Sequence, residues 1–177
     1  FYDDYQPSCF RSISHGEVNV VTALKQSCNI FFFDVGRLVG IDTLNSYSEK
    51  LGFGKKTGIE LPGEMKGIVA GRNYRESVGK TWEDGETLLA AIGQSDNAAT
   101  PLQLVNYVAT IGNGGKFYSP HIIKSIRDAE KNETVYESSD EYTDLGFDAS
   151  TLDAIVEGMV EVSKTGGSAG SGFADYD

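Results

Sequence analysis

The sequence predicts a mixed α/β domain in which helices dominate the first two thirds of the chain. Helix-capping residues stand directly before apolar runs at Asn19 and Thr100. Residues 117–126 carry β-branched and aromatic side chains typical of a β-hairpin, and residues 134–136 can pair with the end of this segment. A last helix over residues 150–162 has apolar residues at i, i+3 and i+4 spacing. The sheet is therefore expected to be small.

Polar caps and glycines divide the N-terminal part into three predicted helices. Asn19 caps a helix that runs to about Gln26, and a second helix runs from the next polar corner to about Val39. Gly40 is a typical residue for the C-terminal end of that helix. Asp42 is the predicted cap of the third helix.

The middle of the chain predicts two loops and one strongly marked helix. Residues 52–71 indicate a loop with short extended pieces, and residues 82–92 a loop that leads into a short segment. Thr100, Pro101 and Gln103 supply a cap, a first-turn proline and a partner for a capping box. Because the helix is apolar nearly all round, we expect it to be deeply buried. Its apolar residues are Leu102, Leu104, Val105, Val108, Ala109 and Ile111.

The C-terminal part combines an acidic segment with the last amphipathic helix. Residues 128–148 contain eight acidic residues and one lysine, which predicts a solvated surface loop rather than a binding site. The helix that follows is expected to bury one apolar stripe. This stripe consists of Leu152, Ile155, Val156, Met159 and Val160.

Composition excludes several classes of function. A net charge of -11 argues against a nucleic-acid partner, because the phosphate backbone would be repelled. Two cysteines, Cys9 and Cys28, make no disulfide framework, and His15 and His121 have no companion at ligand spacing, so no metal and no cofactor are expected. No run spans a membrane. The missing initiator Met leads us to expect an excised fragment of 177 residues.

Ser27 and Asn29 place a hydroxyl and a carboxamide between two apolar segments, with Cys28 between them. Polar side chains in such a place must find partners or line a cavity, because burying them unpaired is costly. A cavity lined by these groups suits proton transfer and amide recognition. The alternative is a simple corner between two helices, with Asn29 as an N-cap.

Several segments resemble, in their order, the transpeptidase domain of class B penicillin-binding proteins, and the resemblance covers nearly the whole chain. The segments are HG at 15–16, ALKQSCNIFF at 23–32, LGFGKKTGIELPGE at 51–64, IGQ at 92–94, TPLQL at 100–104, NGG at 113–115 and SPH at 119–121. The resemblance implies a serine transpeptidase/β-lactamase-like fold, an antiparallel sheet flanked by helices. Residues 1–177 would form a partial, incomplete domain of this kind.

This family resembles other serine acyltransferases in carrying Ser-x-x-Lys, Ser-x-Asn and Lys-Thr-Gly motifs. A lysine takes the proton of the nucleophilic serine, and a second serine relays a proton to the leaving amine. By resemblance, Ser27 is the catalytic relay hydroxyl, and Asn29 is catalytic in holding the substrate amide. Cys28 is then expected to be a packed side chain rather than a reactive thiol.

Two further segments match the Ser-x-x-Lys and Lys-Thr-Gly patterns, and both are interpreted as chance matches without a catalytic role. Ser77 to Lys80 spells Ser-x-x-Lys, but it follows Ser27 instead of preceding it and is predicted to lie in a loop. Lys164-Thr165-Gly166 follows a helix rather than a strand, which is typical of a helix end. Residues 167–169 fit a Gly-Thr-Ala stretch that the family carries after such a helix. The nucleophile and the third motif are therefore expected upstream and downstream of this chain.

The function implied by the resemblance is that of a peptidoglycan D,D-transpeptidase, which crosslinks D-Ala-D-Ala stem peptides through an acyl-serine and is a target of β-lactams. The expected partners are stem peptides, β-lactam antibiotics and cell-wall synthesis proteins, at the extracytoplasmic face of the bacterial membrane. Alternatives are a β-lactamase or D,D-carboxypeptidase of the same fold, and a non-catalytic β-lactam sensor or scaffold. The 177 residues alone are expected to be inactive, because two motifs are missing.

Overall fold

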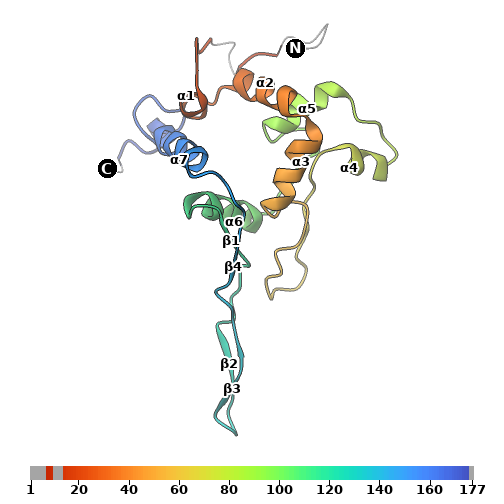
Figure 1. Ribbon diagram of the computed structural model, residues 1–177, viewed down its shortest axis with the longest axis vertical. Helices are drawn as coiled ribbons and strands as arrows, with labels where there is room; N and C mark the ends of the chain where they lie inside the picture. Colours follow the sequence, from red (N-terminus) through yellow and green to blue (C-terminus); the bar gives the residue numbers. More distant parts are fainter. Residues whose placement is uncertain (1–6, 10–13, 176–177) are drawn as a thin grey trace.

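The computed structural model describes residues 7–9 and 14–175 as a set of helices from which a long β-ribbon extends (Figure 1). The helices are α1 (Val20–Lys25), α2 (Asn29–Val39), α3 (Ile41–Lys50), α4 (Arg72–Ser77), α5 (Asp84–Ala91), α6 (Pro101–Gly112) and α7 (Ala149–Ser163), with a short 3₁₀ helix η2 (Gly170–Gly172) after them. The strands are β1 (Lys116–Tyr118), β2 (Ser125–Asp128), β3 (Glu133–Glu137) and β4 (Tyr142–Asp144). None of the helices in this part of the chain has both the length and the hydropathy needed to cross a bilayer.

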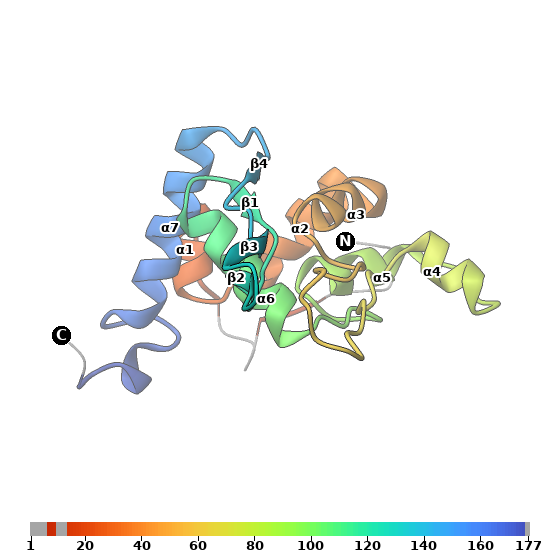
Figure 2. The ribbon, with the colours of Figure 1, turned by 90° about the horizontal axis from the view of Figure 1, so that it is seen from below.

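The helices pack in two groups. Helix α1 lies along α7, while α2 packs on α5 and also contacts α3 (Figures 1 and 2). Helix α4 lies at the far end of the molecule from α1 and α7 in both views. The short corner between α1 and α2 therefore connects the two groups, and this corner carries Ser27 and Asn29.

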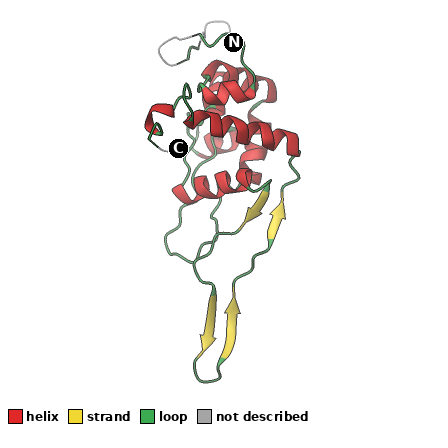
Figure 3. Ribbon diagram, turned by 90° about the vertical axis from the view of Figure 1, so that its left-hand side faces the viewer, coloured by secondary structure: helices red, strands yellow, loops and turns green. Residues whose placement is uncertain are grey.

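The strands of the described residues form two antiparallel pairs instead of one larger sheet. Strand β1 pairs with β4, with Phe117 opposite Thr143, and β2 pairs with β3, with Ile126 opposite Tyr136. The chain runs outward through β1 and β2 and returns through β3 and β4, so the ribbon points away from the helices (Figure 3). The hairpin is confirmed, but the acidic stretch is only partly loop, because β3 and β4 lie within it.

The strongest capping signals in the sequence are confirmed. The Asn19 side chain accepts a hydrogen bond from the Thr22 amide, and the Thr22 hydroxyl in turn caps Asn19, which completes a capping box. Thr100 and Gln103 form the predicted box at the start of α6. Gly40 ends α2 with a φ of 75°, in the left-handed region that favours glycine.

Three local predictions are wrong. Residues 84–91 form helix α5, so most of the 82–92 segment, expected to begin as a loop, is helical; Glu83 and Glu86 make a capping box that does not use the usual Ser, Thr or Asn cap. Ser77 ends helix α4 and does not lie in a loop; Arg75 of this helix pairs with Glu86 and Asp96, which ties α4 to its surroundings. Helix α3 begins directly after Gly40, so Asp42 lies in its first turn and is not its cap.

The sequence predicts that helix α6 is deeply buried, and this prediction is wrong. Val105 is 65% exposed, whereas Gln103 is 2% exposed. The buried amide of Gln103 donates to the carbonyl oxygens of Lys55 (2.7 Å) and Lys66 (2.9 Å), so its own polar group and two loop carbonyls are satisfied together. Hydrogen bonding to the 52–71 loop, rather than hydrophobicity, thus decides which face of α6 is inside.

Helix α7 buries less of its apolar stripe than its pattern suggests. Leu152 is buried, but Met159 and Val160 are exposed. The buried position in the middle of the helix is Gly158, and a Cβ there would overlap the Leu24 side chain of α1. Close approach of α1 at this glycine sets the orientation of α7.

Replacing Gln103 by Ala is expected to lower the free energy of unfolding by about 2 kcal/mol, because the carbonyl oxygens of Lys55 and Lys66 lose the donor that the buried Gln103 side chain supplies. Gln94→Ala is the matched control, since the Gln94 side chain is exposed. Urea unfolding of both variants measures the difference. Equal stability of the two variants would show that the contacts of Gln103 do not hold the loop.

Candidate active site

Ser27 occupies a strained backbone position between α1 and α2. Its φ is +53°, in the left-handed region that costs a residue with a Cβ about 1 kcal/mol. This conformation reverses the chain sharply: the Ser27 amide donates to the Leu24 carbonyl oxygen, and the Cys28 amide to that of Ala23 (2.8 Å). The corner therefore presents the Ser27 side chain outward while Cys28 turns into the interior. Strain of this kind is common at functional sites.

The Ser27 hydroxyl finds its partner far away in the sequence. Its Oγ donates a hydrogen bond to Oγ of Ser168 at 2.8 Å. Ser168 follows α7, and its backbone amide donates to the carbonyl oxygen of Lys25 at 2.8 Å. The sequence offered no sign of this pair, because the two residues belong to segments whose proximity depends on the packing of α1 on α7.

Asn29 is the first residue of α2, and the interpretation of this residue as an N-cap is wrong. The N-cap is Cys28, which makes no side-chain capping bond. Asn29 is half-buried, and no residue in the described part of the chain hydrogen-bonds its side-chain amide.

A charged network ties the corner to the end of α7. The ammonium groups of Lys25 (2.6 Å) and Lys164 (2.8 Å) both donate to the Glu161 carboxylate. Lys164 first, and then Lys25, lower the pKa of Glu161 from 4.5 to about 2, and Glu161 in turn raises the pKa of Lys164. The carboxylate is therefore charged at neutral and mildly acidic pH.

Comparison with known proteins assigns the chain to a family. A model of the penicillin binding protein transpeptidase domain matches residues 3–177. The chain belongs to this family.

Relatives and solved structures agree with the family assignment. Peptidoglycan D,D-transpeptidase MrdA of Acinetobacter baumannii is 32% identical over 167 residues, which cover 93% of this chain and 24% of that protein. PBP2 of Helicobacter pylori, solved in complex with MreC, has a TM-score of 0.70 and 31% identity over 85% of this chain and 26% of that chain. PBP2 of Pseudomonas aeruginosa in complex with WCK 5153 has a TM-score of 0.74 and 28% identity over 87% of this chain and 34% of that chain.

These findings confirm the resemblance to class B penicillin-binding transpeptidases and the fold that it implies. The chain spans about a quarter of the length of the curated relatives that match nearly all of it. The mixture of helices and antiparallel strands is therefore one part of the transpeptidase fold, and Ser27 and Asn29 occupy a helix corner within it.

The two lookalike motifs of the penicillin-binding transpeptidase sequence engage only their own helices. The Ser77 hydroxyl donates to the Tyr74 carbonyl oxygen at 2.7 Å, and its helix α4 lies far from the Ser27 corner (Figure 2). Lys164 is the C-cap of α7, as expected of a helix end, and its ammonium is bound to Glu161. Neither motif contacts Ser27.

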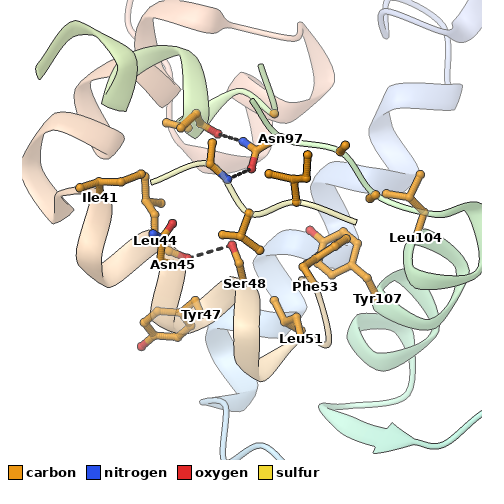
Figure 4. A pocket seen from close by; sticks show the side chains of 18 residues that line it. Ile41, Leu44, Asn45, Tyr47, Ser48, Leu51, Phe53, Asn97, Leu104 and Tyr107 are labelled. Atoms are coloured by element: carbon orange, nitrogen blue, oxygen red, sulfur yellow. Dashed lines mark hydrogen bonds between the residues drawn. The ribbon is translucent and has the colours of Figure 1, made fainter. Parts of the chain in front are cut away.

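One hollow of the described chain lies away from the corner. A cavity of about 520 Å³ is bounded by α3, α5, α6 and the 68–70 segment, and Asn97 bridges two of its walls by hydrogen bonds to Ala70 and Ala90 (Figure 4). Burial raises the pKa of Tyr107, which lines the same cavity. No residue between 25 and 29 lines it. The cavity is therefore not the site to which Ser27 and Asn29 belong.

A cluster behind the corner was missed from the sequence. Cys9, His15 and Cys28 bring their ligand atoms within 4.8 Å of one another, and the two sulfur atoms are 3.8 Å apart. Nδ1 of His15 is buried without a hydrogen-bond partner among the described residues. The expectation that His15 has no other metal-ligating residue near it is thus wrong for the folded chain. Cys9 and Cys28 lie close to it in the structure, although they are 6 and 13 positions away in the sequence.

The cluster has the donor set of a zinc site. Two thiols and one imidazole can supply three of the four ligands that zinc takes in proteins, with one position left for a further group. Cys28 is 4% exposed, which confirms that it is a packed side chain. Burial raises the pKa of its thiol, so a metal would have to displace the proton on binding.

Removing the carboxylate that joins α1 to α7 should give a pH-dependent loss of stability. Because the pKa of Glu161 is lowered on folding from 4.5 to about 2, its stabilisation is complete above pH 4.5 and is lost as the pH falls towards 2. Glu161→Gln should therefore unfold at lower urea than the parent sequence at pH 7, and the difference should shrink below pH 4.5. Asp153→Asn, on an exposed position of α7, is the control. A difference independent of pH would contradict the network.

Metal ligation by Cys9, His15 and Cys28 predicts a spectroscopic signal. Co²⁺ added to the purified protein should produce thiolate-to-cobalt charge-transfer absorption, and Cys28→Ser should weaken it strongly. His121→Ala is the control, since His121 is exposed and lies elsewhere. A spectrum without such absorption would show that the thiols only pack.

Proposed function

We propose that this chain is the middle part of the transpeptidase domain of a peptidoglycan D,D-transpeptidase. The relative from Acinetobacter baumannii, which carries that name, matches 93% of the chain. Apolar side chains such as Leu38 of α2 and Val105 of α6 remain exposed, as expected of a segment that packs against more of the same domain. The observation that carries the proposal is the strained corner that exposes the Ser27 hydroxyl, with the half-buried Asn29 two residues further along the chain.

In the proposed reaction, a serine from the rest of the domain attacks the D-Ala-D-Ala bond of a stem peptide. The leaving amine needs a proton, and the exposed hydroxyl of Ser27 can relay it, because a hydroxyl both accepts and donates. The carboxamide of Asn29 hydrogen-bonds an amide of the bound peptide and orients it. An amine of a neighbouring stem peptide then takes the acyl group, and β-lactams acylate the same nucleophile.

The proposed partners follow from the same relatives. PBP2 of Helicobacter pylori forms a complex with MreC, and a solved peptidoglycan synthase complex contains a chain similar to this one at 28% identity and a TM-score of 0.75. We infer that the protein acts with other cell-wall synthesis proteins at the extracytoplasmic face of the membrane, with stem peptides as substrates. The net charge of -11 agrees with the absence of nucleic acid from this list.

Replacing Ser27 by Ala in the full-length protein is expected to slow acylation by a fluorescent penicillin about 100-fold, the usual contribution of a positioned proton donor. The fold should persist, because the Ser27 side chain is exposed. Ser77→Ala is the matched control and should acylate at the parent rate, since its hydroxyl bonds only to its own helix.

Unchanged acylation of the Ser27→Ala protein would remove Ser27 from the mechanism. Rapid release of the label by water in the parent protein would instead indicate a β-lactamase or D,D-carboxypeptidase. No labelling of the full-length parent would indicate a non-catalytic relative.

A further inference from the structure

The segment after α7 folds back onto the Ser27 corner through two bonds from one residue. The Ser168 amide donates to the Lys25 carbonyl oxygen, and the Ser168 hydroxyl accepts from the Ser27 hydroxyl, both at 2.8 Å. The backbone bond places Ser168 independently of its side chain. The hydroxyl contact is therefore a second, separable interaction.

The turn that carries Ser168 is itself fixed. The Gly167 amide donates to the Lys164 carbonyl oxygen (2.8 Å), and the Ala169 amide to that of Val162 (3.1 Å). A Cβ at Gly167 would overlap the carbonyl oxygen of Val162, and one at Gly170 would overlap that of Lys164. Only glycine fits these two positions, so the path of the turn is closely constrained.

Two further contacts fix the position of the turn relative to the corner. The Lys25–Glu161 ion pair joins the last residue of α1 to the last turns of α7 at 2.6 Å. Gly158 allows the Leu24 side chain to lie directly on the α7 backbone. The distance between Ser27 and Ser168 is thus determined by packing, an ion pair and a main-chain hydrogen bond together.

A hydroxyl that relays a proton changes the direction of its hydrogen bonds. Its partner must therefore be able both to accept and to donate a hydrogen bond. Ser27 donates to Ser168 in this structure, which leaves lone pairs of its Oγ free. When both O–H bonds rotate, Ser168 becomes the donor, and the Ser27 proton is free to point at a leaving amine. This reversal transfers no proton to Ser168 and needs no movement of either oxygen.

We propose that Ser168 is a positioning residue for the transpeptidase reaction. It holds the Ser27 hydroxyl in place both when Ser27 donates their shared hydrogen bond and when Ser168 donates it. The proposal rests on the proposed relay role of Ser27. It assigns a function to the 167–169 segment, in which the Ser168 amide bonds to Lys25 and the Ser168 hydroxyl to Ser27.

Acylation kinetics of the full-length protein with a fluorescent penicillin test this role. Ser168→Ala should slow acylation about tenfold, the size of a typical coupling between hydrogen-bonded side chains, with an unchanged melting temperature because the side chain is exposed. Ser168→Thr retains a hydroxyl and should restore the parent rate. Ser163→Ala is the control, since the Ser163 hydroxyl bonds to Val160 of its own helix. In a Ser27→Ala background, Ser168→Ala should have no further effect.

The outcomes separate this proposal from the one it rests on. If Ser27→Ala slows acylation but Ser168→Ala does not, the role of Ser168 is rejected and that of Ser27 stands. An equal loss from Ser168→Ala with and without the Ser27 hydroxyl would also reject it, since the effect would not pass through Ser27. If Ser27→Ala itself acylates at the parent rate, the proposed relay fails, and the role of Ser168 fails with it.

Discussion

The contact between α1 and α7 is the constraint on which the site depends. Gly158 lets Leu24 lie on the helix backbone, Glu161 binds Lys25, and the turn after α7 then reaches the corner. Helix α1 has six residues, which is too short to be stable in isolation. Its geometry is therefore set by α7, and the left-handed conformation of Ser27 is maintained by the same packing. The Ser27 hydroxyl is exposed because the backbone conformation of Ser27 directs its side chain outward.

In helix α6, hydrogen bonding to the loop backbone determines which side chains are buried more than their hydrophobicity does. Gln103 is almost completely buried because the 52–71 loop needs donors, while Val105 two residues later is open. Within the same loop, Glu64 accepts hydrogen bonds from the Thr57 amide and hydroxyl. The loop between α3 and α4 is thus ordered by side chains that satisfy its main chain, as expected for a long segment without regular structure.

What could be predicted from the sequence was mostly local. Caps at Asn19 and Thr100 act within four residues of chain, and both helices begin where these residues place them. The burial of α6 could not be predicted, because the side chains that bind the loop are selected by a distant segment. The Ser27–Ser168 bond and the Cys9–His15–Cys28 cluster depend on how α1, α2 and α7 pack, which no spacing rule encodes. Ser27 and Asn29 stand out in the sequence as polar residues between two apolar segments, and the resemblance to a known family supplies the roles proposed for them.

The central claim is that the Ser27–Asn29 corner belongs to the active site of a penicillin-binding transpeptidase. The structure of the full-length protein acylated by a β-lactam would test it most directly. We expect the Asn29 carboxamide to donate to the amide side chain of the bound β-lactam at about 3 Å, with the Ser27 hydroxyl at a similar distance from the reacting centre. An acyl group bound to a serine that neither Ser27 nor Asn29 approaches would contradict the claim.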